Sequence, residues 1–372
     1  MKYRIAFVPF LFQVAAVMSW AQSVSSSQPK STPNATYSES LSYTPFVFGP
    51  AIKPKSDKDK KPRPSKSDSS TSQTTDASSL TIPVSVFDVE GHFVLGLTKA
   101  DIEVFIDNEK QDILAFDSDD EALNIIFLID TSPSIAYSIE EIQKFLTASL
   151  TEFRTRDEIS VIKFDGETKV LIDSSNDKDA ISKAIRKLKF GDGTSLYEAI
   201  ENVVKKNAGF NGRPKTILVL TDAVDTTSQK SDYNKSLLEA QKSDSIFVPV
   251  YIDTFQANLN AAKKSSGSSV LIPGIGKVYG SAPVIKEEYE LGKKYLTDLF
   301  SLTGGRAYIF QPASSGASTT NPNILRDLRT RYTVTIKKPE SNHAGEIKQI
   351  RVRVNRPNLT VFSKSSLAVV TE

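Results

Sequence analysis

The stretch Asn124–Ser134, NIIFLIDTSPS, decides the fold. Its first seven residues form a continuous apolar run ending in Asp130, which is typical of a parallel strand covered on both faces. A second such run, KTILVLTD, ends in Asp222, and a third is IFVPVYID. Apolar residues at helical spacing predict helices at 138–153, 180–188 and 195–206. This alternation of strands and helices predicts a doubly wound, mostly parallel α/β sheet.

Strand-like alternation flanks this unit on both sides. LTIPVSVFD (80–88), HFVLGL (92–97) and IEVFID (102–107) predict strands before it, and RYTVTIKK (331–338) and IKQIRVRVN (347–355) predict a β-hairpin after it. VFSKS (361–365) is a possible further strand. We therefore predict one small β-domain in two parts, residues 79–117 and 331–368, with an α/β domain at 122–330 inserted between them. Residues 254–286 have the composition of a long insertion.

The N-terminal residues indicate an exported protein. Lys2 and Arg4 precede an apolar run, and Ser19-Trp20-Ala21 offers small residues for cleavage, so residues 1–21 are predicted to be a signal peptide. Residues 22–78 are rich in Ser, Thr, Pro and Lys and are predicted to form a disordered linker. We expect a bacterial periplasmic or extracellular location. No transmembrane segment is expected after signal cleavage.

Composition excludes several classes of function. The chain has no cysteine, which excludes disulfides, thiolate metal sites and a cysteine nucleophile. Loss of Lys2 and Arg4 with the signal would leave 44 basic residues against 44 acidic ones. A neutral mature chain gives no reason to expect nucleic acid as a partner.

Candidate metal ligands follow the predicted strands. Ligands of open α/β sheets bind at the carboxyl ends of the strands, where Asp130, Ser132 and Ser134 form a D-x-S-x-S pattern. GDGTSLYEAI places Thr194 at a helix start, and KTILVLTD supplies Asp222. Two carboxylates and three hydroxyls suit a hard ion such as Mg²⁺ rather than zinc. Two negative charges leave a coordination position for water or an incoming carboxylate.

D-T-S-P-S, G-D-G-T and L-T-D, in this order, resemble the metal-ion-dependent adhesion site (MIDAS) of von Willebrand factor type A domains. The resemblance implies a Rossmann-like fold over about 124–310, and 80–370 also resembles the exported bacterial "VWFA-related" proteins. It further implies Mg²⁺, or Mn²⁺ or Ca²⁺, contacted directly by the three hydroxyls and through water by the two aspartates. Pro133 and Ala223 stand where the family commonly has glycine.

The resemblance implies an adhesion or envelope-assembly module whose metal captures a Glu or Asp of a protein partner. We expect no enzymatic activity. The two histidines, His92 and His343, lie in the predicted β-domain, and no G-x-S-x-G motif exists. Two alternatives stay open: a structural envelope protein with a stabilising metal, and a metal-dependent hydrolase that activates water.

Overall fold

The computed structural model describes residues 38–39, 79–118, 122–207, 215–264, 270–272, 276–278, 285–310, 324–329, 331–340 and 346–369. The predicted signal peptide (1–21), His343 and all of the predicted linker except residues 38–39 lie outside these ranges. Within them, no helix combines the length and the apolar character needed to cross a membrane.

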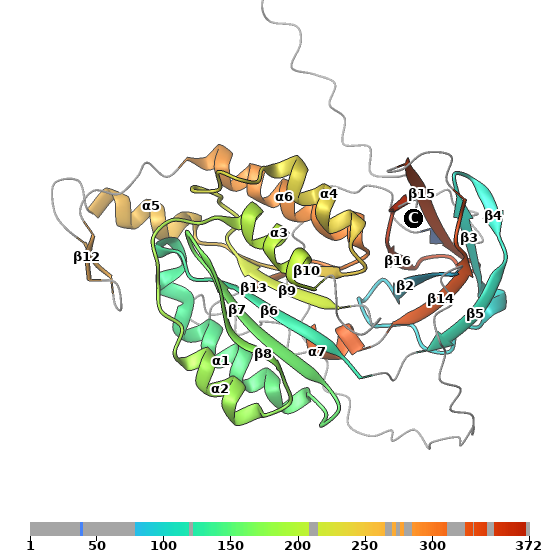
Figure 1. The fold of residues 1–372 in the computed structure, drawn as a ribbon, viewed down its shortest axis with the longest axis horizontal. Helices are drawn as coiled ribbons and strands as arrows, with labels where there is room; N and C mark the ends of the chain where they lie inside the picture. Colours follow the sequence, from blue (N-terminus) through green and yellow to red (C-terminus); the bar gives the residue numbers. More distant parts are fainter. Residues whose placement is uncertain are drawn as a thin grey trace, which may run out of the picture. The chain divides into compact units, whose positions relative to one another are not determined.

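The α/β unit is built on a six-stranded sheet in the order β13-β10-β9-β6-β7-β8 (Figure 1). All neighbouring strands are parallel except β8, which pairs antiparallel with β7. The strands are β6 (Asn124–Asp130), β7 (Glu158–Phe164), β8 (Thr168–Ser175), β9 (Thr216–Thr221), β10 (Ile246–Ile252) and β13 (Tyr308–Phe310). The central strands β9 and β10 are buried at every residue, because helices cover both faces. The predicted α/β fold class is confirmed.

Two helical layers enclose the sheet, each with its own apolar core (Figure 1). Helices α1 (Ile139–Ser149), α2 (Lys178–Arg186) and α7 (Ile324–Arg329) pack on one face. Helices α3 (Leu196–Asn207), α4 (Tyr233–Lys242) and α6 (Lys286–Thr303) pack on the other. Short 3₁₀ helices are η1 (Lys99–Asp101), η2 (Pro133–Ser138) and η3 (Leu150–Glu152). The expected core runs at 125–129, 217–220 and 247–251 supply buried side chains to both layers.

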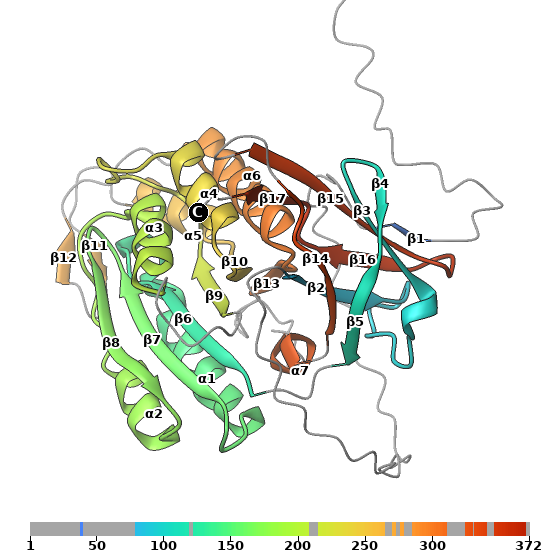
Figure 2. The same ribbon diagram turned by 45° about the vertical axis from the view of Figure 1, so that its right-hand side comes forward.

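The flanking segments form two packed antiparallel sheets (Figure 2). One has the order β16-β2-β14-β5, from β2 (Ser79–Phe87), β5 (Ile113–Ser118), β14 (Tyr332–Lys337) and β16 (Thr360–Ser363). The other has the order β1-β15-β3-β4, with β17 (Ser366–Val369) also on β15, from β1 (Ser38–Glu39), β3 (Ile102–Ile106), β4 (Glu109–Gln111) and β15 (Glu346–Val354). Each sheet draws strands from both sides of the α/β unit, although the exact domain boundaries stay predictions.

The predicted hairpin of 331–338 and 347–355 is wrong. β14 pairs with β2 and β5, whereas β15 pairs with β3 in the other sheet. Strict alternation identifies a half-buried strand but does not select its partner, and both strands bury their apolar face in the same inter-sheet core. The strand expected at 92–97 is also wrong, since only Phe93 forms an isolated bridge, to Phe87.

Two segments show structure that composition did not indicate. Ser38–Glu39, inside the predicted linker, form β1 on the edge of β15. A strand edge offers unpaired N–H and C=O groups, so backbone pairing there needs no apolar side chains. Within 254–286, the structure contains α5 (Phe255–Lys264) and the antiparallel pair β11 (Val270–Ile272) and β12 (Gly276–Val278).

Candidate functional site

The two candidate aspartates lie side by side at the carboxyl edge of the α/β sheet. β6 and β9 are adjacent parallel strands, with Ile129 opposite Leu220. Asp130 ends β6, and Asp222 follows the last residue of β9. Both residues are 0% exposed. The sheet register therefore buries two carboxylates at one place.

The two serines complete this group. The Ser132 amide donates to Asp130 Oδ1 at 2.8 Å, and the Ser132 and Ser134 hydroxyl oxygens are 3.0 Å apart. The Ser134 hydroxyl in turn hydrogen-bonds to Asp222. Pro133 is the first residue of η2, where its fixed φ suits a helix start and its missing N–H costs nothing. Four of the five predicted ligands therefore form one connected group.

Thr194 is linked to this group only indirectly, through the backbone of its loop. The Thr194 amide donates to Thr226 Oγ1 at 2.9 Å, and its carbonyl accepts from the Thr226 and Thr227 amides. Gly191 N donates to the Thr131 carbonyl at 3.2 Å, which ties the Thr194 loop to the D-x-S-x-S loop. The Thr194 side chain is buried and makes no hydrogen bond with the other four. The structure thus brings its loop, rather than its hydroxyl, against the group.

Two glycines allow that close approach. Gly193 has a φ of +73°, a region that side chains disfavour, and a Cβ on it would lie 2.4 Å from Thr227 Cγ2. A Cβ on Gly191 would meet the Asp165 carboxyl group at 2.2 Å. The G-D-G-T sequence therefore serves backbone packing at both glycines.

The electrostatics of the aspartate pair are unfavourable without a cation. Burial raises the pKa of Asp130, and the neighbouring charge of Asp222 raises it further. Burial also raises the pKa of Asp222, against hydrogen bonds from Thr254 and Ser134 that lower it. Both residues lie in the described part of the chain, and neither forms an ion pair there with lysine or arginine. A divalent cation would supply the missing positive charge.

The donor set fits a hard cation. Carboxylate and hydroxyl oxygens suit Mg²⁺, Mn²⁺ or Ca²⁺. Among the described residues, no three His, Cys, Asp or Glu side chains gather as a metal-binding group. An ion held at this edge would therefore have to use the serine and threonine hydroxyls together with the two carboxylates.

Several residues of this edge were missed in the sequence. The Thr221 hydroxyl donates to Asp130 Oδ2 at 2.6 Å, and the Thr254 hydroxyl donates to Asp222 Oδ2 at 2.7 Å. Thr254 directly follows Asp253 at the end of IFVPVYID, so the rule that located Asp130 and Asp222 could have found it. Asn258 and Tyr289 contact Thr254 from two helices, and no local sequence signal marks them.

Ala223, which directly follows Asp222, has a φ of +64°. Its amide donates to Thr221 Oγ1 at 2.9 Å. A left-handed conformation costs a residue with a side chain about 1–2 kcal/mol, so Ala223 stores strain beside Asp222. The Ala223 carbonyl lies close against α6 at Gly292, where a Cβ would leave it no room.

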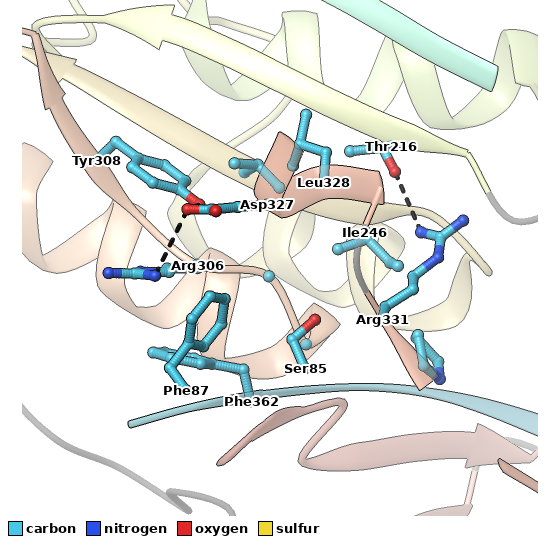
Figure 3. Close-up of a pocket in the computed structure, with 14 residues that line it drawn as sticks. Ser85, Phe87, Thr216, Ile246, Arg306, Tyr308, Asp327, Leu328, Arg331 and Phe362 are labelled. Carbon is cyan, nitrogen blue, oxygen red and sulfur yellow. Dashed lines mark hydrogen bonds and ion pairs between the residues drawn. The ribbon is translucent and has the colours of Figure 1, made fainter. Parts of the chain in front are cut away.

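A small cavity of about 30 Å³ lies at the opposite, amino edge of the sheet (Figure 3). Thr216 and Ile246, the first residues of β9 and β10, line it together with Phe87 and Phe362 of the β-sheets. The Arg306 guanidinium stacks over Phe87, 4.3 Å from the ring centroid. A volume of this size holds one or two waters. The cavity is a packing feature of the junction and is separate from the aspartate pair.

His92 is an exposed loop residue whose Nδ1 lies 3.4 Å from Asp88 Oδ2. This position agrees with the expectation that it takes no part in the site.

One family model matches part of the chain. Residues 125–224 match the family model of the von Willebrand factor type A domain. Among solved structures, the chain is similar to the conserved hypothetical protein BatB from Bacteroides thetaiotaomicron, with 14% identity over 56% of this chain and 100% of that chain, at a TM-score of 0.41. No curated protein matches the sequence.

Two further solved structures are similar. Proximal thread matrix protein 1 from the mussel byssus, with a zinc-occupied MIDAS motif, shows 14% identity over 58% of this chain and 48% of that chain, at a TM-score of 0.39. A von Willebrand factor type A protein from Catenulispora acidiphila shows 12% identity over 75% of this chain and 76% of that chain, at a TM-score of 0.34.

Proposed function

Since the chain contains a von Willebrand factor type A domain, we propose that its carboxyl edge binds a divalent cation and that the ion captures a protein partner. Domains of this family often bind a divalent metal and commonly mediate protein–protein interactions. The proposed metal is Mg²⁺, or Mn²⁺ or Ca²⁺. The proposed ligands are Asp130, Ser132, Ser134, Thr194 and Asp222.

One observation carries the proposal: Asp130 and Asp222 are fully buried and adjacent, and neither is paired with a lysine or arginine of the described residues. An isolated buried carboxylate costs several kcal/mol, and a second one beside it adds repulsion. Asp130 already accepts hydrogen bonds at both oxygens, from Ser132 N and Thr221 Oγ1. This fits the family's pattern in which the aspartates act through water while hydroxyls contact the ion.

Capture of a Glu or Asp from the partner follows from charge. Two carboxylates and three neutral hydroxyls leave a hard ion with capacity for another anionic oxygen. We propose that the chain works outside the cytoplasm of a bacterium as an adhesion or envelope-assembly module, without catalysis. Residues 254–286, whose helix α5 reaches the Ser134 carbonyl through Asn258, would help to select the partner.

Metal binding is tested first, by titrating Mg²⁺ into the wild type and Asp222→Asn in a calorimeter at pH 8. We expect one site in the wild type and a loss of at least tenfold in the variant, since a charged ligand is removed. An equal affinity for both proteins would place the ion elsewhere.

Partner capture is tested separately with the immobilised chain and an envelope extract. We expect protein to be retained in Mg²⁺ and released by a chelator, and Asp130→Ala to retain none. If the protein binds the metal but retains no partner that a chelator releases, the ion only stabilises the fold. Turnover of ester or phosphate substrates that Asp130→Ala abolishes would instead support a hydrolase.

A further inference from the structure

Three side chains behind the proposed ligands, two buried and one half-buried, form a hydrogen-bonded network that the proposed function does not use. They are Thr254, which follows β10, Asn258 of α5 and Tyr289 in the first turns of α6. Thr254 is 3% exposed and Tyr289 is 5% exposed. The Phe255 ring packs edge-on against the Tyr289 ring, with centroids 5.2 Å apart. Two helices and one strand end therefore meet at this point.

The network ends at two proposed metal-binding segments. The Thr254 hydroxyl donates to Asp222 Oδ2 at 2.7 Å. Asn258 Nδ2 lies 3.2 Å from the Ser134 carbonyl, 2.9 Å from Thr254 Oγ1 and 3.0 Å from the Tyr289 hydroxyl. Its two hydrogens are thus shared among three acceptors. Because the Thr254 hydrogen goes to Asp222, the Tyr289 hydroxyl, 3.3 Å away, is left to donate to Thr254.

These hydrogen bonds set the separation between the Ser134 loop and the Asp222 carboxylate, which the backbone of the sheet alone does not set. Ser134 lies in η2, beyond the end of β6, and Asp222 follows β9, so each sits on a loop outside the sheet ladder. Asn258 donates to the Ser134 carbonyl of the first loop. Through Thr254 it is also linked to the Asp222 carboxylate of the second loop. Groups of this kind orient metal ligands without touching the metal, and their loss typically weakens metal affinity 10- to 100-fold.

We propose that Thr254, Asn258 and Tyr289 are positioning residues, a clamp that holds the Asp222 carboxylate and the Ser134 loop at the separation the metal requires. The proposal rests on the proposed metal site. It also gives residues 254–286 a role, because Asn258 links the first helix of that segment to the Ser134 loop.

The test compares substitutions that differ in one group only. Thr254→Val keeps the shape of the side chain and removes the hydroxyl, whereas Thr254→Ser keeps the hydroxyl. Tyr289→Phe keeps the ring that packs on Phe255 and removes only the oxygen. Thr151→Val is the matched control. The Thr151 side chain is exposed, and its hydroxyl donates to the Ala148 carbonyl at the end of α1 rather than to the network.

Mg²⁺ affinity is measured for each folded variant by calorimetry at pH 8, and the unfolding temperature is measured in chelator. We expect Thr254→Val to bind Mg²⁺ about tenfold or more weakly, Tyr289→Phe to be weakened less, and Thr254→Ser to match the wild type. Thr151→Val should also match it. The Thr254→Ser rescue separates positioning from a general loss of stability.

The failures of the two proposals are distinct. If the wild type binds Mg²⁺ and both Thr254→Val and Tyr289→Phe bind it equally well, the clamp is wrong and the metal site stands. If the wild type binds no Mg²⁺, Mn²⁺ or Ca²⁺, the metal site itself is wrong and the clamp falls with it. If Thr254→Val does not fold, the comparison of Tyr289→Phe with the wild type decides the clamp.

Discussion

Buried aspartates occur at both edges of the α/β sheet, and they are satisfied in different ways. At the amino edge, the Asp157 side chain is 0% exposed and pairs with Arg329, whose Nη2 lies 2.6 Å from Oδ2. The amides of Leu123 and Arg154 also donate to Asp157. Burial opposes its ionisation, but these hydrogen bonds outweigh burial and lower the pKa of Asp157. The charge of the Asp157 carboxylate is therefore balanced by the guanidinium of Arg329.

At the carboxyl edge, Asp130 and Asp222 accept hydrogen bonds but pair with no cationic side chain in the part of the chain that the structure describes, and their pKa values are raised. Their neighbour Asp165, at the end of β7, is by contrast paired with Lys163. The comparison shows that the fold can neutralise buried carboxylates with side chains. It leaves one adjacent pair without such a partner, where an external cation would fit.

The largest effect is expected at the amino edge. Arg329→Met would leave Asp157 buried and unpaired, which typically costs 3–5 kcal/mol of stability. Chemical denaturation should show this loss with and without Mg²⁺, since Asp157 is remote from the proposed metal site. If Mg²⁺ removed the difference in stability between Arg329→Met and the wild type, the distinction between the two edges would be wrong.

The second effect concerns the packing of the Asp222 loop. Gly292→Ala would place a Cβ 2.3 Å from the Ala223 carbonyl oxygen and 2.9 Å from the Ala223 Cβ. Overpacking of this kind costs about 1–3 kcal/mol, more than the gain from replacing glycine within a helix. Denaturation of Gly292→Ala and the wild type in chelator measures the cost. A variant as stable as the wild type would contradict the contact.

The two edges should also respond oppositely to pH. The raised pKa of Asp130 stabilises the fold below its ordinary value of 3.8, and this contribution is lost as pH rises through the folded value. The lowered pKa of Asp157 contributes above 3.8 and is lost as pH falls. In chelator at pH 8, Asp130→Asn should therefore be more stable than the wild type by at least about 1.4 kcal/mol, the free energy of one pKa unit.

Denaturation of both proteins between pH 4 and 8 measures this difference, which should shrink toward pH 4 and reverse when Mg²⁺ is added at pH 8. If the difference in stability did not depend on pH, the pKa of Asp130 would not be raised in the folded protein.

Ala223→Gly should have the smallest effect. Glycine removes the cost of the positive φ, about 1–2 kcal/mol, but loses about 0.5–1 kcal/mol through greater freedom in the unfolded chain. A gain of between zero and about 1.5 kcal/mol is expected from denaturation in chelator. A clear loss would show that the Ala223 methyl group contributes packing that outweighs the strain.

Sequence patterns located the elements that carry the site and missed what surrounds it. Continuous apolar runs identified β6 and β9 because a strand covered on both faces has no polar positions, and the same runs placed Asp130 and Asp222 at one edge. The partners Asn258 and Tyr289 lie 36 and 67 residues beyond Asp222, on the helices α5 and α6. The apolar spacing of a helix predicts which face packs against the core, but not which polar side chains reach the site. Strand alternation likewise found β14 and β15 but paired them wrongly, because both face one shared core.

The most direct test of the central claim is thermal and chemical unfolding of the wild type and Asp130→Ala at pH 8, in chelator and in Mg²⁺. The account predicts that Mg²⁺ at 100 times its dissociation constant stabilises the wild type by about 2.7 kcal/mol and leaves Asp130→Ala unchanged. Equal stabilisation of the two proteins would place the ion elsewhere, and an absence of stabilisation in both would mean that this edge holds no Mg²⁺.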